Sequence, residues 1–217
     1  MRNGLRGGRL GVWVLGAGLW LCLASASHGS SVRQVSLDEL VARSALIFQG
    51  VVQAVEPRLH TDGRRMHSYV RFRVERVLAG RAPGPTLTLR YLGGQVGEHA
   101  LRVAGLVLPE VGERGIYFVE SRTRHQVHPL YGWEQGCVRI VPDGRGHARL
   151  TTRSGIPIVA IEPEAATTRR APGAAPRAAH PEAALGVVID AGARLEEALD
   201  PGAFRRWLRQ RRAELTR

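Results

Sequence analysis

The residues most able to support chemistry in this chain are its histidines. His125 and His128 are separated by two residues, and His99 and His147 offer further imidazole nitrogens. Zinc requires three or four ligands that converge on one point, often with a cysteine pair or a His-Glu motif. Neither accompanies these residues, so we expect surface histidines, and neither a metal site nor a cofactor.

Cys137 is the second candidate, because a cysteine can act as a nucleophile when a nearby base lowers its pKa. The segment around it alternates, with Val138 and Ile140 predicted to point inward. We therefore expect Cys137 to face outward, either as a free thiol or in an intermolecular disulfide. The sequence holds no G-x-S-x-G elbow that would activate a serine. No catalytic residue is predicted, and the chain is expected not to be an enzyme.

Three glycines form the third candidate, Gly93, Gly94 and Gly97. Neither a lysine nor a helix start follows them, as phosphate-binding loops require. Glycine tolerates positive φ angles, so we interpret this segment as a structural turn between strands.

A candidate binding face comes from alternating aromatic and cationic residues on two predicted strands. Its members are Tyr69, Arg71, Arg73, Arg90 and Tyr91. Small barrels bind nucleic acid or sugar on such faces through stacking and charge. Outward positions of any arginine-rich barrel would show the same pattern, so an ordinary solvated face remains the alternative.

The elements that position these residues are short strands of period two. Val70, Phe72 and Val74 alternate with charged residues, and the pattern resumes at 87–91 after a Pro/Gly-rich connection. Ser36 is a good N-cap for a short helix, and Asp200 followed by proline begins a second. The sequence predicts a mainly β protein, a small OB-like β-barrel with one short N-terminal and one C-terminal helix.

Four segments organise the chain. Residues 1–26 combine an arginine-rich start, an apolar run and a small-residue cleavage site, which predicts a signal peptide and a periplasmic or secreted protein. Residues 30–161 form the barrel domain, 162–184 an Ala/Pro-rich linker, and 185–217 a C-terminal segment with a basic amphipathic helix. That helix either docks its apolar stripe (Phe204, Trp207, Leu208, Leu215) on the domain or makes peripheral contact with an anionic membrane.

The charge of the chain is strongly positive, +12 at neutral pH. All basic residues are arginine, together with abundant Ala, Gly and Pro, as in proteins from GC-rich genomes. Selection for phosphate contacts would not exclude lysine. Net charge alone therefore does not predict a nucleic-acid partner.

The order of these motifs carries a resemblance. The segments SLDELVARSALIFQGVV, YVRFRVERVLAG, LTLRYLGGQVG, GLVLPEVGERGIYFVE and YGWEQGCVRI follow one another. The chain resembles a family of uncharacterised exported bacterial proteins with an OB-like barrel, and is distantly similar to the netrin modules of tissue inhibitors of metalloproteinases. Those inhibitors chelate zinc through an N-terminal cysteine, and no cysteine lies near the predicted mature start.

The expected function is that of an exported, non-enzymatic binding module. The resemblance implies an exported protein as partner, with a protease as one candidate by analogy. The alternative is a polyanion, nucleic acid or acidic glycan, held on the arginine-rich face. The oligomeric state is not predicted.

Overall fold

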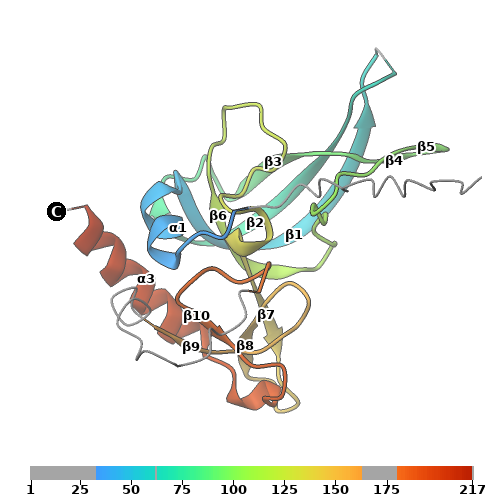
Figure 1. Ribbon diagram of the computed structural model, residues 1–217. Helices are drawn as coiled ribbons and strands as arrows, with labels where there is room; N and C mark the ends of the chain where they lie inside the picture. The colour runs from blue at the N-terminus through green and yellow to red at the C-terminus, as the bar shows by residue number, and fades with distance from the viewer. Residues whose placement is uncertain (1–32, 62, 163–179, 217) are drawn as a thin grey trace, which may run out of the picture.

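The structure is a computed structural model that describes residues 33–61, 63–162 and 180–216. The elements within these ranges are two α-helices, ten strands and two short 3-10 helices. Their bounds are α1 Leu37–Arg43, β1 Leu46–Leu59, β2 Met66–Gly80, β3 Thr86–Leu92, β4 Gly94–Val96, β5 His99–Leu101, β6 Arg114–Val119, η1 Trp133–Gly136, β7 Cys137–Pro142, β8 Ala148–Thr151, β9 Ile158–Ile161, β10 Val187–Ile189, η2 Leu195–Glu197 and α3 Pro201–Leu215 (Figure 1).

The main sheet has six antiparallel strands in the order β3-β2-β1-β6-β7-β8. Two small sheets accompany it, β10-β9 and β4-β5. The mainly β class and the two helices are as predicted. The closed barrel is not confirmed, because in the described residues β3 and β8 end the sheet at opposite edges without pairing.

The central strands β1 and β6 are buried on both faces of the sheet, which explains why they are apolar on both sides. Along β6, Ile116 and Phe118 enter one core, and Tyr117 and Val119 enter the other. The first core lies under α1, α3 and β9, and the second is enclosed by the curled half of the sheet around Phe48 and Phe72. Along β6, period-two alternation thus separates two cores, whereas along β2 and β3 it separates the second core from solvent.

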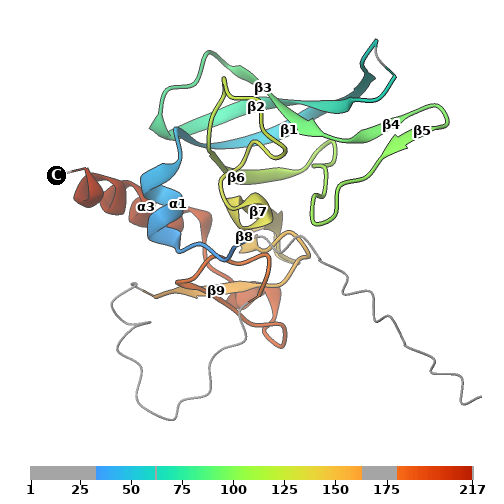
Figure 2. The ribbon, with the colours of Figure 1, turned by 45° about the horizontal axis from the view of Figure 1, so that its top comes forward.

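Helix α1 begins at its predicted cap. The Ser36 hydroxyl accepts a hydrogen bond from the backbone N–H of Glu39 at 3.0 Å. In Figures 1 and 2 the helix lies beside α3. Arg211 of α3 binds Asp38 of α1 with both ends of its guanidinium group, at 2.6 and 2.5 Å. This pair joins the first and last helices across the sequence.

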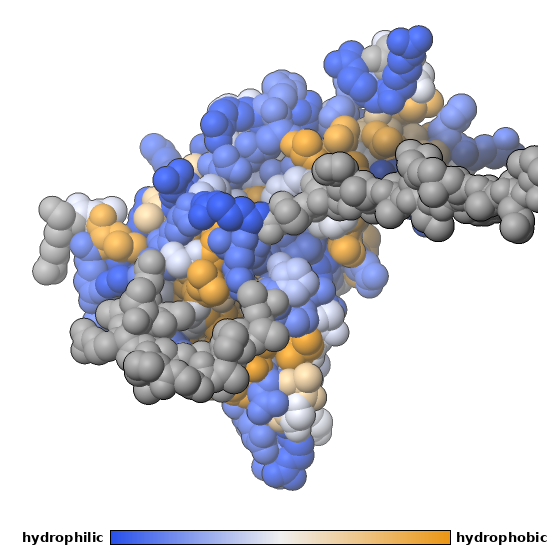
Figure 3. Space-filling model, in the orientation of Figure 1, coloured by the Kyte–Doolittle hydropathy of each residue, from blue (hydrophilic) through white to orange (hydrophobic). Residues whose placement is uncertain are grey.

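Helix α3 docks on the domain, one of the two alternatives derived from its amphipathic pattern. The Asp200 carboxylate caps Ala203 at 3.0 Å, and Phe204 and Leu208 are buried in the first core. Leu215, predicted to share this stripe, is instead 41% exposed. The apolar face of α3 is thus used within the protein. On the surface seen in Figure 3, apolar residues form separate patches among hydrophilic ones. None of the helices in the described residues has the length and apolar character to cross a membrane.

The predicted glycine turn is partly strand. Gly94 begins β4, which pairs with β5 as a projecting hairpin (Figure 2). Gly93, Gly94 and Gly97 all have positive φ, at 95°, 138° and 57°. A Cβ at Gly93 would lie 2.6 Å from the carbonyl oxygen of Leu101, so both conformation and space require glycine there.

Two predicted segments fall partly or wholly outside the described residues. The signal peptide, residues 1–26, lies outside them completely. Of the predicted linker, 163–179 lies outside them. Residues 180–184 are described, and Ala184 packs in the first core.

Gly50 lies at an irregularity in the pairing of β1 with β2. A Cβ there would be 2.6 Å from the carbonyl oxygen of Arg73 and 2.9 Å from the Phe48 ring. We expect Gly50→Ala to lower the free energy of unfolding by about 1–3 kcal/mol, because overpacking forces backbone and side chains to shift. Urea unfolding would measure this. Gly84→Ala, where the added Cβ meets open space, is the matched control, and an equal effect of both would contradict the overpacking account.

Candidate binding surfaces

Four of the five residues predicted to form a binding face lie together on one face of the sheet. Val70 and Phe72 of β2 point into the second core, so Tyr69, Arg71 and Arg73 point the other way. Arg90 is the cross-strand partner of Tyr69. We call Tyr69, Arg71, Arg73 and Arg90 the outer face.

The positive charge of the outer face is partly neutralised. Arg71 lies 3.9 Å from the Glu56 carboxylate, and Arg73 lies 3.4 Å from that of Glu75. Tyr69 is covered by the guanidinium group of Arg58, 4.8 Å from its ring centroid. A stacking platform for bases or sugars is therefore less available than the sequence pattern indicated.

Tyr91 does not belong to the outer face, and its assignment there was wrong. Its side chain is fully buried in the second core. Tyr91 follows Leu87 and Leu89 at period two, and these point inward, so Tyr91 must point inward too. Burial raises the pKa of its hydroxyl well above the ordinary value.

The outer edge of β3 is open along part of its length. In an antiparallel strand, the N–H and C=O groups of alternate residues point to the same edge. The N–H of Leu92 points away from β2, because it donates to the carbonyl oxygen of Val127 at 2.9 Å. Arg90 and Thr88 share that direction, and among the described residues neither main-chain group has a partner on this side.

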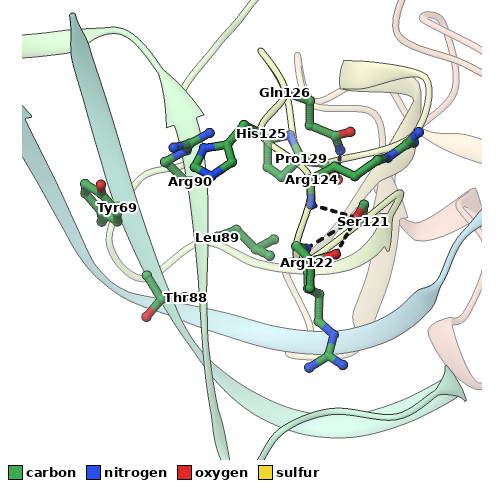
Figure 4. A pocket seen from close by; sticks show the side chains of 11 residues that line it. Tyr69, Thr88, Leu89, Arg90, Ser121, Arg122, Arg124, His125, Gln126 and Pro129 are labelled. Atoms are coloured by element: carbon green, nitrogen blue, oxygen red, sulfur yellow. Dashed lines mark hydrogen bonds between the residues drawn. The ribbon is translucent and has the colours of Figure 1, made fainter.

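A groove of about 410 Å³ runs along this open edge. Figure 4 shows Thr88, Leu89 and Arg90 of β3 on one side and the segment 121–129 on the other. The Ser121 hydroxyl accepts hydrogen bonds from the backbone N–H groups of Thr123 and Arg124, at 3.3 and 3.1 Å, which shapes the opposite wall. We call this feature the edge groove.

The edge groove is cationic. Arg90, Arg122, Arg124 and His125 line it, and of these only Arg124 forms an ion pair within the described residues, with Glu120 at 2.5 Å. The pKa of the neighbouring His67 is influenced by the same positive charge. Burial and then the positive charge of Arg90 lower the pKa of this histidine. The groove therefore favours an anionic occupant.

A second constellation, which sequence analysis missed, lies in the interior. Arg153 binds both oxygens of Glu113 at 3.3 and 3.2 Å and donates to the carbonyl oxygen of Leu108 at 2.7 Å. Its Nε lies 3.1 Å from Glu134, an ion pair without hydrogen-bond geometry. Glu134 accepts the backbone N–H of Val107 at 3.0 Å. This cluster ties the 106–113 segment and η1 to the sheet.

Cys137 belongs to the same cluster, and the prediction that it faces outward was wrong. Its side chain is 1% exposed, and its Sγ lies 3.8 Å from Glu113. Burial first, and then the negative charge of Glu113, raises the pKa of the thiol far above its ordinary value. A raised pKa disfavours the nucleophilic thiolate, and the buried side chain is not accessible to a second protein molecule in the folded structure.

His128 was also misplaced by the sequence analysis, which put it on the surface. It is 3% exposed, stacks on Trp133 with ring centroids 5.4 Å apart, and approaches Glu134 at 3.5 Å. Burial lowers its pKa. No group of three or more metal-ligating side chains occurs in the described part of the chain.

No local sequence signal marks the interior cluster. Glu113 and Arg153 are 40 positions apart and meet only because the end of β8 comes close to the start of β6 through β7. Three residues of the edge groove, Tyr69, Arg90 and His125, were named from the sequence, but as members of separate candidate sites. The wall of the groove opposite β3 lies in 121–129, a segment without periodicity.

Comparison with known proteins adds no neighbour. No protein-family model, no curated protein and no solved structure matches the chain. The function must be inferred from the two surfaces described above.

Proposed function

We propose that the protein is an exported, non-enzymatic binding module that holds a partner protein at the edge groove. The partner contributes an acidic, extended segment that adds to the sheet as a strand next to β3. The observation that carries this proposal is the open main-chain edge at Thr88 and Arg90 beside a cationic groove.

Strand addition would use both the unpaired main-chain edge of β3 and the positive charge of the groove. An extended peptide pairs its main chain with an exposed edge, which gives affinity, and its side chains enter pockets, which gives specificity. The groove is long enough to span three consecutive residues of β3. Arg90 and Arg122, which form no ion pair within the described residues, would select aspartate and glutamate in the incoming segment and steer its approach.

The more specific fold and partner are also proposals. An OB-like barrel is the architecture we propose to underlie this sheet, which curls around the second core without closing. Another exported protein is the proposed partner, and a protease is a candidate only by the resemblance to netrin modules. Export itself rests on the predicted signal peptide.

The second candidate function is binding of a nucleic acid or an acidic glycan on the outer face. This function is supported by Arg71, Arg73 and Arg90, which lie on one face of the sheet. The support is weakened by the carboxylates of Glu56 and Glu75, which lie close to Arg71 and Arg73. Such binding would fall steeply with salt. Main-chain pairing at β3 would persist, because neutral hydrogen bonds and apolar contacts are not screened by salt.

A selection of random linear peptides on the immobilised protein tests the proposed function. We expect enriched peptides to carry aspartate or glutamate spaced two residues apart, as one face of an added strand requires. The peptides should compete with partner protein captured from culture fluid or the cell envelope.

The control for this selection is a variant protein that carries both Arg90→Glu and Arg122→Glu. It should select peptides rich in arginine or lysine, because the groove wall then carries the opposite charge. Enrichment that does not change between the two baits, or peptides without an acidic bias, would contradict the proposal.

A further inference from the structure

A second hollow, of about 490 Å³, lies between the start of α3 and the C-terminal part of β2. Arg76, Val77 and Leu78 line it from the strand, and Gly202, Arg205, Arg206 and Arg209 line it from the helix. Four of its seven lining residues are therefore arginines. We call it the arginine hollow, and it shares no residue with the edge groove.

The guanidinium groups converge where the helix has no side chain. A Cβ at Gly202 would lie 3.5 Å from a terminal nitrogen of Arg205 and 3.7 Å from one of Arg206. Arg205 is fixed by a hydrogen bond to the Gln49 side chain at 2.9 Å, and Gln49 is in turn held by Glu75 at 2.6 Å. The hollow is thus partly organised by buried polar groups of the sheet.

The charge of the hollow is not balanced within the described residues. None of Arg76, Arg205, Arg206 and Arg209 forms an ion pair there. Asp200 lies beside the hollow: a Cβ at Gly202 would be 2.7 Å from its carboxylate, which also caps Ala203. Its negative charge acts on Arg205 and offsets at most one of the four positive charges. Burial, and next the positive charge of Arg76, lowers the pKa of Arg205, as expected where cations crowd together.

We propose that the arginine hollow binds a phosphate-bearing ligand with at least two phosphate groups. Guanidinium groups bind phosphate oxygens through paired hydrogen bonds, and several of them around one hollow match several phosphates. Such a ligand comes either free in solution, as a polyphosphate does, or as the headgroup of an anionic lipid.

Calorimetric titration of the purified protein with tripolyphosphate at low salt tests this site. Arg76→Ala with Arg206→Ala should weaken binding by about tenfold or more, because each variant removes a charge-assisted contact. Arg102→Ala with Arg145→Ala removes the same charge from two exposed, distant positions and should leave the affinity nearly unchanged. Thermal melting of both variants checks that they fold.

Equal weakening by both pairs would overturn the proposal, since it would indicate attraction to the whole basic surface, as would absence of binding. If the site is supported, vesicles of phosphatidylcholine and cardiolipin, whose headgroup carries two phosphates, identify the source. The ligand is a lipid headgroup if the protein floats with these vesicles, if added tripolyphosphate prevents the flotation, and if the Arg76/Arg206 variant does not float. Tripolyphosphate binding without flotation indicates a free ligand. The arginine hollow and the edge groove share no residue, so a substitution in the groove, such as Thr88→Pro, leaves the hollow intact. Failure of the phosphate proposal is therefore distinguishable from failure of the proposed function.

Discussion

Replacing Arg153 by methionine should lower the free energy of unfolding by about 3–5 kcal/mol, the expected cost of removing one partner of a buried ion pair. The Arg153 side chain is 9% exposed, and it faces Glu113 and Glu134, which are 3% and 11% exposed. Methionine fills similar space but leaves both carboxylates buried without a cation. Urea unfolding would give the free energy directly.

Two further variants separate lost pairing from lost packing. Adding Glu113→Gln and Glu134→Gln to Arg153→Met should restore much of the stability, because neutral amides cost less to bury than unpaired carboxylates. Arg145→Ala, at an exposed turn, should change stability little. If Arg153→Met were as mild as Arg145→Ala, the cluster would not hold the 106–113 segment as described.

Replacing Thr88 by proline should abolish binding of an acidic peptide while leaving the fold in place. Proline has no N–H, and its ring would meet an incoming strand. The Thr88 N–H points to the open edge rather than to β2, so the sheet loses no hydrogen bond. We expect the affinity to fall by about tenfold or more, which corresponds to ~1.4 kcal/mol, as measured by fluorescence anisotropy of a labelled peptide.

Thr88→Val is the matched control, because it changes the same side chain and keeps the N–H. It should bind nearly as the unchanged protein does. Circular dichroism and thermal melting verify that the proline variant is folded, and Arg90→Glu provides a second route if it is not. Unchanged affinity of a folded Thr88→Pro protein would exclude pairing at this edge.

Much of the fold could be predicted from local patterns. The caps at Ser36 and Asp200 and the alternation in 70–74 and 87–91 are properties of neighbouring residues, and they predicted α1, α3, β2 and β3. Local alternation does not show whether one or both faces of a strand are covered by other elements. Cys137 and Val138 therefore appeared to be outside and inside, although each enters a different core.

The sites were less predictable, for a similar reason. Tyr69, Arg71, Arg73 and Arg90 were placed on one face, because strand parity fixes their direction. The interior cluster of Glu113, Glu134 and Arg153 depends on loops that meet only in three dimensions. The arginine hollow likewise requires α3 to lie against β2, whereas docking of α3 on the domain was only one of two alternatives derived from the sequence.

Amide hydrogen exchange by NMR, with and without an acidic peptide obtained from the selection, tests the central claim most directly. The open edge predicts that the amides of Thr88 and Arg90 exchange rapidly in the free protein and become strongly protected in the complex. Protection of both amides is the predicted result, and in Thr88→Pro, which lacks the residue 88 amide, the Arg90 amide should stay unprotected. A complex in which both stay unprotected, with changes confined to Arg71 and Arg73, would contradict strand addition and favour the outer face.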